Sequence, residues 1–226
     1  MSTAPAPIEI ETGANPRASI VLMHGLGADG NDFVPIAHEM DLSAAGPVRF
    51  VFPNAPVMPV TLNGGYAMPA WYDIYPPEPG RPRREDESGL RQSQAAIEAL
   101  LAREKARGVP AGRIVIAGFS QGCAMALMTG LRHAQPLAGI VALSGYLPLA
   151  GTTAAERDPA NQATPVFMAH GRHDDVVVMS RATESRDLLQ SLGYHVQWHD
   201  YAMPHSVCME EVADLQRWLV QVLGDR

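Results

Sequence analysis

The chain alternates short apolar runs with longer segments in which apolar residues recur every three or four positions. Strands that alternate with helices in this way form parallel sheets covered by helices on both faces. The apolar runs predict strands at 19–23, 48–52, 113–117, 138–143, 165–169 and 194–198. The helical patterns lie at 32–40, 89–107, 121–131, 180–192 and 206–223. We therefore expect an α/β fold with a mostly parallel central sheet and a further edge strand at 8–11.

Residues 53–84 interrupt this alternation, because they show neither the helical nor the strand period and contain eight prolines. Long segments without regular structure are uncommon in compact domains and are often functional. This one is too apolar for a solvated linker, since it contains Leu62, Met68 and Trp71. It could pack over the edge of the sheet, form the wall of an apolar pocket, or do both.

The composition narrows the classes of function. With 226 residues and no internal repeat or linker, we expect one domain over residues 1–226. The net charge of −7 argues against nucleic acid or an acidic membrane surface as the main partner. No segment approaches the ~20 apolar residues of a membrane span, and the N-terminus lacks a signal-peptide pattern. We expect a cytoplasmic protein without stable membrane insertion.

The two cysteines, Cys123 and Cys208, are too few for a disulfide framework or a four-thiolate metal site. Cys123 lies in a predicted buried helix, where it would be held away from a second thiol. Two reduced thiols are the expected state.

A serine stands at the corner between a predicted strand and a predicted helix, in the sequence GFSQG. Glycines at positions 118 and 122 would let strand and helix pass closely and ease the strained turn that exposes the Ser120 hydroxyl. The G-x-S-x-G pattern alone is weak, but this strand–turn–helix context is what a nucleophile elbow requires. The alternative is that Ser120 only caps the helix.

A serine nucleophile needs a base and an acid that orients it. In this architecture they should follow the serine in the order acid, then histidine, each after a later strand. Asp174 and Asp175 follow the strand expected at 165–169. His205 follows the last expected strand and stands just before the last helix. Both the order and the placement favour these residues as the partners of Ser120.

The other histidines fit structural roles better. The spacing of His195 and His199 would suit a metal pair on a helix, but on a strand it only places them on one face, so no metal site is predicted. His170 and His173 precede the candidate acid and fit structural roles. His133 ends a predicted helix, and His38 lies on a predicted surface helix where it should be inert.

An acyl-transfer site also needs fixed donors for the oxyanion. The backbone N–H of Gln121, the residue after the nucleophile, is the first candidate. The second should come from the loop after an earlier strand, and His24-Gly25-Leu26-Gly27 provides glycines there. A phosphate-binding glycine loop is the rival interpretation, but the further glycine and the lysine of that motif are missing.

Together these segments resemble the carboxylesterase and acyl-protein thioesterase (phospholipase/carboxylesterase) family of α/β-hydrolases, most closely its bacterial carboxylesterase branch. The matching motifs are HGLGADGNDF, FPNAPVMPVTLNGGYAMPAWYDI, GFSQGCAMAL, ALSGYLP, HGRHDDVV and YAMPHSV, in family order. The resemblance implies an α/β-hydrolase fold and a triad of Ser120, Asp174 and His205. It also implies an oxyanion hole formed by the backbone amides of Leu26 and Gln121.

Two positions depart from the family pattern. The family often has proline at the position of Asp175 and glycine at the position of Pro204. Asp174 is preferred as the acid because it stands four residues after His170 in the motif H-G-x-x-D. Proline at 204 holds Met203 extended but should let His205 reach the serine.

We therefore expect a carboxylesterase that cleaves short- to medium-chain esters through an acyl-enzyme on Ser120, without cofactor or metal. A thioester or lysophospholipid substrate with the same triad is the alternative, and a non-catalytic ligand-binding relative is a third. Leu62, Met68 and Trp71 are expected to contact the substrate, although Trp71 could instead anchor its loop on the sheet. The resemblance also suggests a homodimer.

Overall fold

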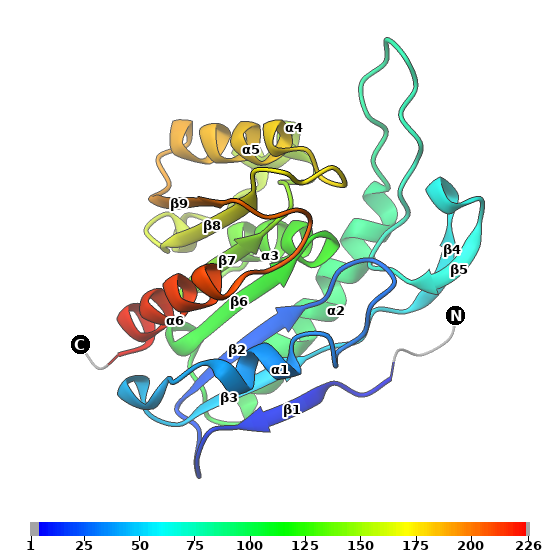
Figure 1. Ribbon diagram of the computed structural model, residues 1–226. Coiled ribbons are helices and arrows are strands. Elements are labelled where there is room, and N and C mark those ends of the chain that lie inside the picture. The colour runs from blue at the N-terminus through cyan, green and yellow to red at the C-terminus, as the bar shows by residue number, and fades with distance from the viewer. Residues whose placement is uncertain (1–4, 225–226) are drawn as a thin grey trace.

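The centre of the protein is a seven-stranded sheet with the strand order β1-β3-β2-β6-β7-β8-β9 (Figure 1). A computed structural model describes residues 5–224, so the first four and last two residues of the expected domain lie outside the described residues. Strand β1 runs antiparallel to β3, and the other strands run parallel to one another. The strands are β1 (Ile8–Glu11), β2 (Ala18–Met23), β3 (Val48–Phe52), β6 (Ile114–Phe119), β7 (Gly139–Leu143), β8 (Val166–Gly171) and β9 (Val196–Tyr201).

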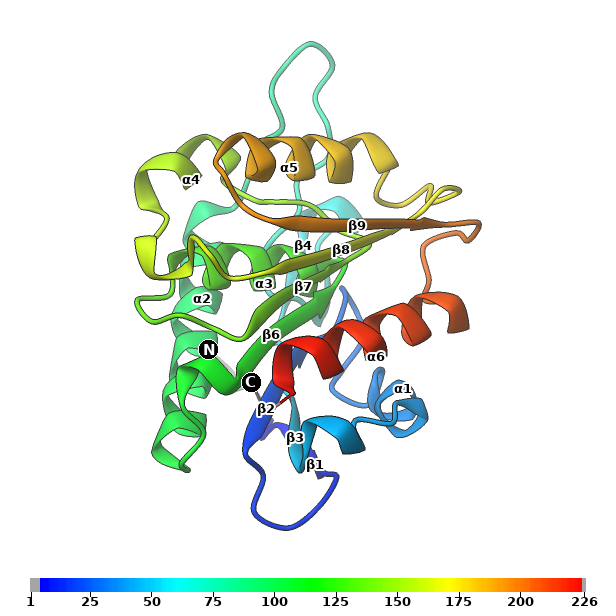
Figure 2. The ribbon, with the colours of Figure 1, turned by 90° about the vertical axis from the view of Figure 1, so that its left-hand side faces the viewer.

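Helices cover both faces of this sheet, as the sequence predicts (Figure 2). One face packs against α2 (Glu87–Ala106), α3 (Gln121–Arg132), α4 (Ala150–Glu156) and α5 (Met179–Ser191). The other face packs against α1 (Val34–Glu39) and α6 (Met209–Leu223). Strands β2, β3 and β7 are buried along their whole length, which explains why their sequences are mostly apolar, with Ser19 on β2 and Arg49 on β3 as polar exceptions. Within residues 5–224, no helix has the length and apolar character needed to cross a bilayer.

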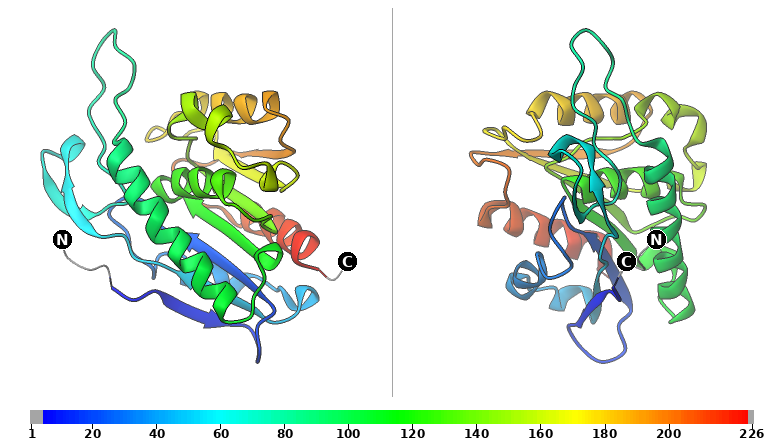
Figure 3. Two further views of the ribbon diagram at one scale, coloured as in Figure 1. Left: turned by 180° about the vertical axis from the view of Figure 1, so that it is seen from behind. Right: turned by 90° about the vertical axis from the view of Figure 1, so that its right-hand side faces the viewer.

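The segment 53–84 is not free of regular structure, and that sequence expectation is wrong. It contains a hairpin of β4 (Val57–Val60) and β5 (Tyr66–Pro69), separate from the main sheet. Pro59 and Pro69 interrupt the alternation that would reveal the strands, but proline is tolerated in a strand with a free edge. The loop between β5 and α2 projects beyond the sheet at the same end of the molecule as the hairpin (Figure 3).

Two further differences concern helices. The structure contains α4, which the sequence pattern does not suggest because its sequence AGTTAAE is short and lacks an apolar stripe. Helix α6 begins at Met209 and not at Ser206, because Ser206–Cys208 belong to the loop that follows β9.

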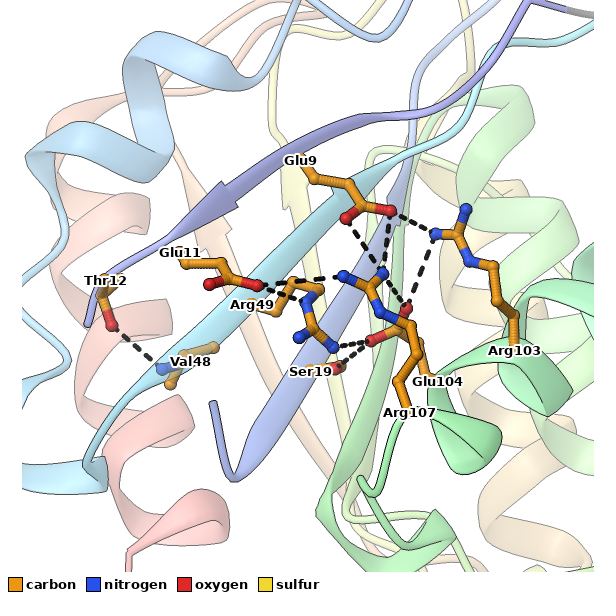
Figure 4. A network of polar contacts seen from close by, with 9 residues as sticks. All are labelled: Glu9, Glu11, Thr12, Ser19, Val48, Arg49, Arg103, Glu104 and Arg107. Atoms are coloured by element: carbon orange, nitrogen blue, oxygen red, sulfur yellow. Dashed lines mark hydrogen bonds and ion pairs between the residues drawn. The ribbon is translucent and has the colours of Figure 1, made fainter. Parts of the chain in front are cut away.

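A buried carboxylate joins α2 to the edge of the sheet (Figure 4). The side chain of Glu104 is fully buried and accepts hydrogen bonds from Ser19 on β2, at 2.7 Å, and from Arg49 on β3, at 2.8 Å. Arg107 donates to its other oxygen at 2.9 Å. Arg49 also pairs with Glu11 of β1 at 2.9 Å, so the network connects three strands and one helix.

Candidate active site

The turn between β6 and α3 holds Ser120 in a strained backbone conformation, with φ 57° and ψ −116°. Such a conformation is costly for a residue with a side chain and is typical of functional sites. A Cβ at Gly118 would overlap the backbone of Gly122, and one at Gly122 would overlap the carbonyl of Met23. The two glycines therefore allow strand and helix to pass closely enough to raise the serine at the corner.

His205 lies between Ser120 and Asp174 and is hydrogen-bonded to both. Its Nε2 is 3.0 Å from the Ser120 Oγ, and its Nδ1 is 2.6 Å from Asp174 Oδ2. The other carboxylate oxygen of Asp174 accepts the backbone N–H groups of Val176 and Val177 at 2.9 and 2.8 Å. These bonds fix the carboxylate, so the Asp174–His205 contact can orient the ring toward the serine.

The acid and the histidine come from the loops that follow β8 and β9, as the sequence predicts. A Cβ at Gly171 would overlap the carbonyl oxygens of Met203 and Pro204, so this glycine lets the two loops pack together. Pro204 is exposed and does not prevent the Ser120–His205 contact. Asp175 is exposed, whereas Asp174 is buried.

The loop after β2 packs against the nucleophile. A Cβ at Gly25 would lie 3.3 Å from the Ser120 Cβ. His24 positions this loop, because its Nδ1 donates to the Gly25 carbonyl at 2.7 Å while its Nε2 accepts the Ala55 N–H at 3.0 Å. These bonds require a neutral ring, and burial lowers the pKa of His24 accordingly.

The two amides expected to form the oxyanion hole belong to the loop after β2, which adjoins Ser120 at Gly25, and to the first residue of α3. Within residues 5–224 the backbone N–H of Leu26 has no hydrogen-bond acceptor. Gln121 is the first residue of α3, so its N–H has no acceptor within the helix. Among the described residues, neither N–H is occupied by another acceptor, which is what an oxyanion hole requires of its donors.

The side chain of Gln121 has a second role that the sequence reasoning missed. Its Oε1 accepts the backbone N–H of Trp71 at 3.0 Å, and its Nε2 donates to the Tyr72 carbonyl at 2.8 Å. The Trp71 indole N–H donates to the His24 carbonyl at 2.9 Å, and Ser93 donates to the Trp71 carbonyl. Trp71 thus ties the end of the hairpin segment to both loops beside Ser120.

The three predicted substrate contacts lie in different surroundings. Trp71 is only 4% exposed, and its contacts are those of an anchor. Met68 is partly buried, with its sulfur 3.7 Å from the position of a Cβ on Gly27, in the loop after β2. Leu62 is 45% exposed on the far end of the hairpin.

Two of the remaining histidines have structural contacts. His170 is buried and its Nε2 contacts the Val177 carbonyl at 2.7 Å, which supports the loop of Asp174. His199 stacks on Phe167, with ring centroids 5.0 Å apart. Within the described part of the chain, no three His, Cys, Asp or Glu side chains are placed to share a metal ion.

The parallel sheet with a serine on the β6–α3 turn defines an α/β-hydrolase. The comparison with known families is more specific, because residues 6–223 match the phospholipase/carboxylesterase family. The chain belongs to this family and is a hydrolase, as the sequence resemblance implied.

Curated relatives and solved structures agree with this assignment. The chain is 39% identical to acyl-protein thioesterase 1 of Yarrowia lipolytica, over 94% of this chain and 95% of the relative. It is 40% identical to acyl-protein thioesterase 1 of Neurospora crassa, over 96% of this chain and 91% of that one. Among solved structures, acyl-protein thioesterase 2 of Zea mays superposes with a TM-score of 0.81 at 28% identity, covering 96% and 99% of the two chains.

Proposed function

We propose that this protein hydrolyses short- to medium-chain carboxylic esters through an acyl-enzyme on Ser120. The observation that carries the proposal is the position of His205, which is hydrogen-bonded to Ser120 at 3.0 Å and to Asp174 at 2.6 Å. In the first step, His205 takes the proton of the Ser120 hydroxyl as its oxygen attacks the ester carbonyl. The N–H groups of Leu26 and Gln121 stabilise the resulting oxyanion.

Collapse of the tetrahedral intermediate breaks the bond to the leaving alcohol, which receives the proton from His205. The same histidine then deprotonates a water molecule, which attacks the acyl-enzyme and releases the carboxylic acid. Every proton movement uses side chains of this chain, so the proposed reaction needs no cofactor.

The proposed acyl site lies along the β4–β5 hairpin. Met68 lies against Gly27 in the loop after β2, and Leu62 and Tyr66 are exposed farther out, at 45% and 71%. An open apolar strip of this kind offers contact to an acyl chain without enclosing it, so preference among chain lengths should be graded.

A thioester substrate is the second candidate. It is favoured by the relatives named acyl-protein thioesterase 1, which match this chain over almost its full length. The attacking group, the base and the oxyanion donors would be the same, and only the leaving atom would change from oxygen to sulfur. The values of kcat/KM for matched esters and thioesters of graded chain length distinguish the two candidates.

Covalent labelling tests the chemistry itself. A fluorophosphonate should label the native protein on Ser120, and peptide mapping identifies the residue. Ser120→Ala should lose the label and, as in other serine triads, about 10⁶ of turnover, while the fold is retained. Ser191→Ala, an exposed serine at the end of α5, is the control and should label like the native protein. A folded native protein that takes no label would contradict the proposal and favour a ligand-binding relative.

The exposed apolar residues of the hairpin also bear on the homodimer suggested by the sequence. Val57 on β4 is 56% exposed, and we propose that β4 forms the contact between two copies, which leaves Leu62 and Tyr66 open to the acyl chain. Light scattering on the native protein and on a Val57→Ser variant measures this directly. A dimer that persists unchanged in the variant would place the contact elsewhere.

A further inference from the structure

His170 is a buried histidine beside the loops of Asp174 and His205, and the proposed reaction does not use it. It belongs to the end of β8 and is 0% exposed. Strand β9, which leads to His205, lies beside β8 (Figure 2). The side chain of Asp174, four residues after His170, is also fully buried. The sequence HGRHDDVV therefore buries two titratable groups at one end of the sheet.

The ring of His170 binds the far end of the loop that carries Asp174. Its Nε2 lies 2.7 Å from the carbonyl oxygen of Val177. The backbone N–H of the same valine donates to Asp174 Oδ1 at 2.8 Å. The N–H of Asp174 in turn donates to the Gly171 carbonyl at 3.3 Å. Hydrogen bonds thus connect His170, Val177 and Asp174 in one closed set.

Two backbone bonds fix the first part of this loop against the segment that leads to His205. The N–H of Arg172 donates to the Tyr201 carbonyl at 2.8 Å, and the N–H of His173 donates to the Met203 carbonyl at 3.1 Å. The second part of the loop, residues 174–177, is the part that the His170 ring holds. Loss of the ring should therefore displace the carboxylate and leave the strands in place.

The same ring nitrogen is also close to the carboxylate itself. His170 Nε2 lies 3.4 Å from Asp174 Oδ2, which is the oxygen that His205 contacts at 2.6 Å. The hydrogen bond of His170 goes to the Val177 carbonyl, because that contact is much the shorter. At 3.4 Å a charge on the ring would still act on the carboxylate, so the protonation state of His170 affects the pairing of Asp174 with His205.

The surroundings of the two ring nitrogens define that protonation state. A carbonyl oxygen only accepts, so Nε2 of His170 carries a proton. Within residues 5–224, Nδ1 is buried without a hydrogen-bond partner, so a second proton there would lack an acceptor. Burial lowers the pKa of His170, and the Val177 carbonyl and the charge of Asp174 offset this only in part, while His205 lowers it further. The ring is therefore neutral, with its single proton on Nε2.

We propose that His170 is a positioning residue for Asp174, which it holds against His205 through the Val177 carbonyl without sharing its negative charge. This inference rests on the proposed function, in which His205 gains a proton and Asp174 stabilises the resulting charge. A charged His170 would compete for the same carboxylate oxygen. A neutral donor fixes the loop and leaves the charge of Asp174 to His205.

Nitrogen-15 spectra of the native protein test the protonation state without any substitution. The chemical shifts of the two ring nitrogens distinguish a neutral ring with its proton on Nε2 from the other tautomer and from the charged ring. The signals of His170 are identified by their absence from His170→Gln. We expect a neutral ring with the proton on Nε2 from about pH 6 to 8. A charged ring at pH 7, or a single proton on Nδ1, would overturn the proposal.

Two substitutions test the positioning. His170→Leu keeps a side chain of similar size but removes the donor, so kcat should fall about ten- to a hundredfold while KM changes less than about threefold. This fall is smaller than the loss of about 10⁴ expected for Asp174→Asn, because the carboxylate is displaced and not removed. In His170→Gln the side-chain amide can donate from nearly the same place, so kcat should return to within about threefold of the native value.

A proton resonance reports the position of Asp174 without substrate. The proton between His205 Nδ1 and Asp174 Oδ2 should give a signal at low field, because this hydrogen bond is short and involves a carboxylate. We expect the signal to shift or broaden in His170→Leu and to be retained in His170→Gln. The matched control is His133→Leu, which removes a buried histidine that contacts Glu98 at the far end of α3. It should leave both kcat and the signal unchanged.

A folded His170→Leu variant with the native signal and the native kcat would contradict the positioning role, as would equal losses of kcat in the Leu and Gln variants. The nitrogen-15 spectra of the native protein still decide if His170→Leu does not fold. Because neither spectrum needs turnover, the two proposals can fail separately. A signal that depends on His170 in a protein that cleaves no ester would support the positioning and contradict only the proposed function.

Discussion

At the scale of single residues, two neighbouring aspartates have opposite surroundings. Asp174 is buried and bound to His205 and two backbone amides, while Asp175 is exposed. Asp174→Asn should lower kcat by about 10⁴, because the amide cannot hold the imidazole in the required tautomer. Asp175→Asn, the matched control, should change kcat less than threefold. Steady-state kinetics on both variants measures this, and the reverse order of effects would assign the acid to Asp175.

A buried acid on α6 makes stability depend on pH. The side chain of Glu211 is 0% exposed and neither oxygen makes a well-formed hydrogen bond within residues 5–224. Burial raises its pKa to about 8, opposed only in part by the backbone N–H of Cys208. Between the ordinary pKa of 4.5 and about 8, the unfolded chain has lost this proton while the folded protein keeps it. The contribution of Glu211 to stability therefore falls as pH rises through this range.

Glu211→Gln removes that dependence and keeps the shape of the side chain. The variant and the native protein should have similar free energies of unfolding near pH 4.5. The variant should be more stable by about 2–4 kcal/mol near pH 8. Urea unfolding at several pH values measures the difference, with exposed Glu210→Gln as the control. A constant difference across this pH range would show that Glu211 does not titrate on unfolding.

The sequence pattern predicts the residues of the candidate site better than it predicts the hydrogen bonds that hold the surrounding segments in place. The approach of Ser120, Asp174 and His205 to one another could be predicted because each follows a recognisable strand and stands in a short motif. The side-chain bonds of Gln121 to the Trp71–Tyr72 backbone could not, because they join residues about fifty positions apart. Nothing in the local sequence indicates which backbone group a buried glutamine will contact.

At the scale of elements, the β4–β5 hairpin is held to the domain by the segment that follows it. Trp71→Phe keeps an aromatic ring but removes the N–H that binds the His24 carbonyl. A buried carbonyl left without its donor costs about 1–3 kcal/mol, so the melting temperature should fall. If Trp71 is only an anchor, kcat/KM should change by the same factor for all acyl chain lengths. A shifted chain-length preference would instead place Trp71 in the acyl site.

The elements that the sequence pattern predicts well are those of the main sheet. Parallel strands are buried on both faces, so their apolar runs are unambiguous, as at β2 and β7. The hairpin strands are largely exposed and contain prolines, and α4 packs only a few side chains. Such elements owe their structure to contacts with distant segments, which the local pattern does not contain.

At the scale of the whole molecule, the Glu104 network couples the edge of the sheet to α2. Burial alone would raise the pKa of Glu104, but hydrogen bonds from Ser19 and Arg49, together with the positive charges of Arg107 and Arg49, outweigh it and lower the pKa below 4.5. A lowered pKa adds stability above the unfolded value, and this contribution is lost as pH falls through the folded value. Glu104→Gln should therefore lower the free energy of unfolding by about 3 kcal/mol at pH 7. The neutral amide no longer forms an ion pair with Arg49, which then keeps, among residues 5–224, only its ion pair with Glu11.

Thermal unfolding at pH 7 and at pH 3 tests this expectation. The gap between the variant and the native protein should narrow at the lower pH, because below 4.5 the unfolded native chain takes up this proton before the folded protein does. Glu78→Gln, which removes an exposed ion pair with Arg81, is the control and should change little at either pH. A gap of equal size at both pH values would show that the charge of Glu104 does not matter.

The placement of the triad on three strand ends has a consequence for the order of folding. His205 stands 85 residues after Ser120 and 31 after Asp174. The histidine reaches the serine only after β8 and β9 have added to the sheet in parallel register, and long-range parallel pairing is slow. A chain emerging from the ribosome can thus form the β6–α3 corner long before it can become reactive. During refolding, esterase activity should return later than the helical circular dichroism signal. The rate at which activity returns would then report the addition of β8 and β9 to the sheet.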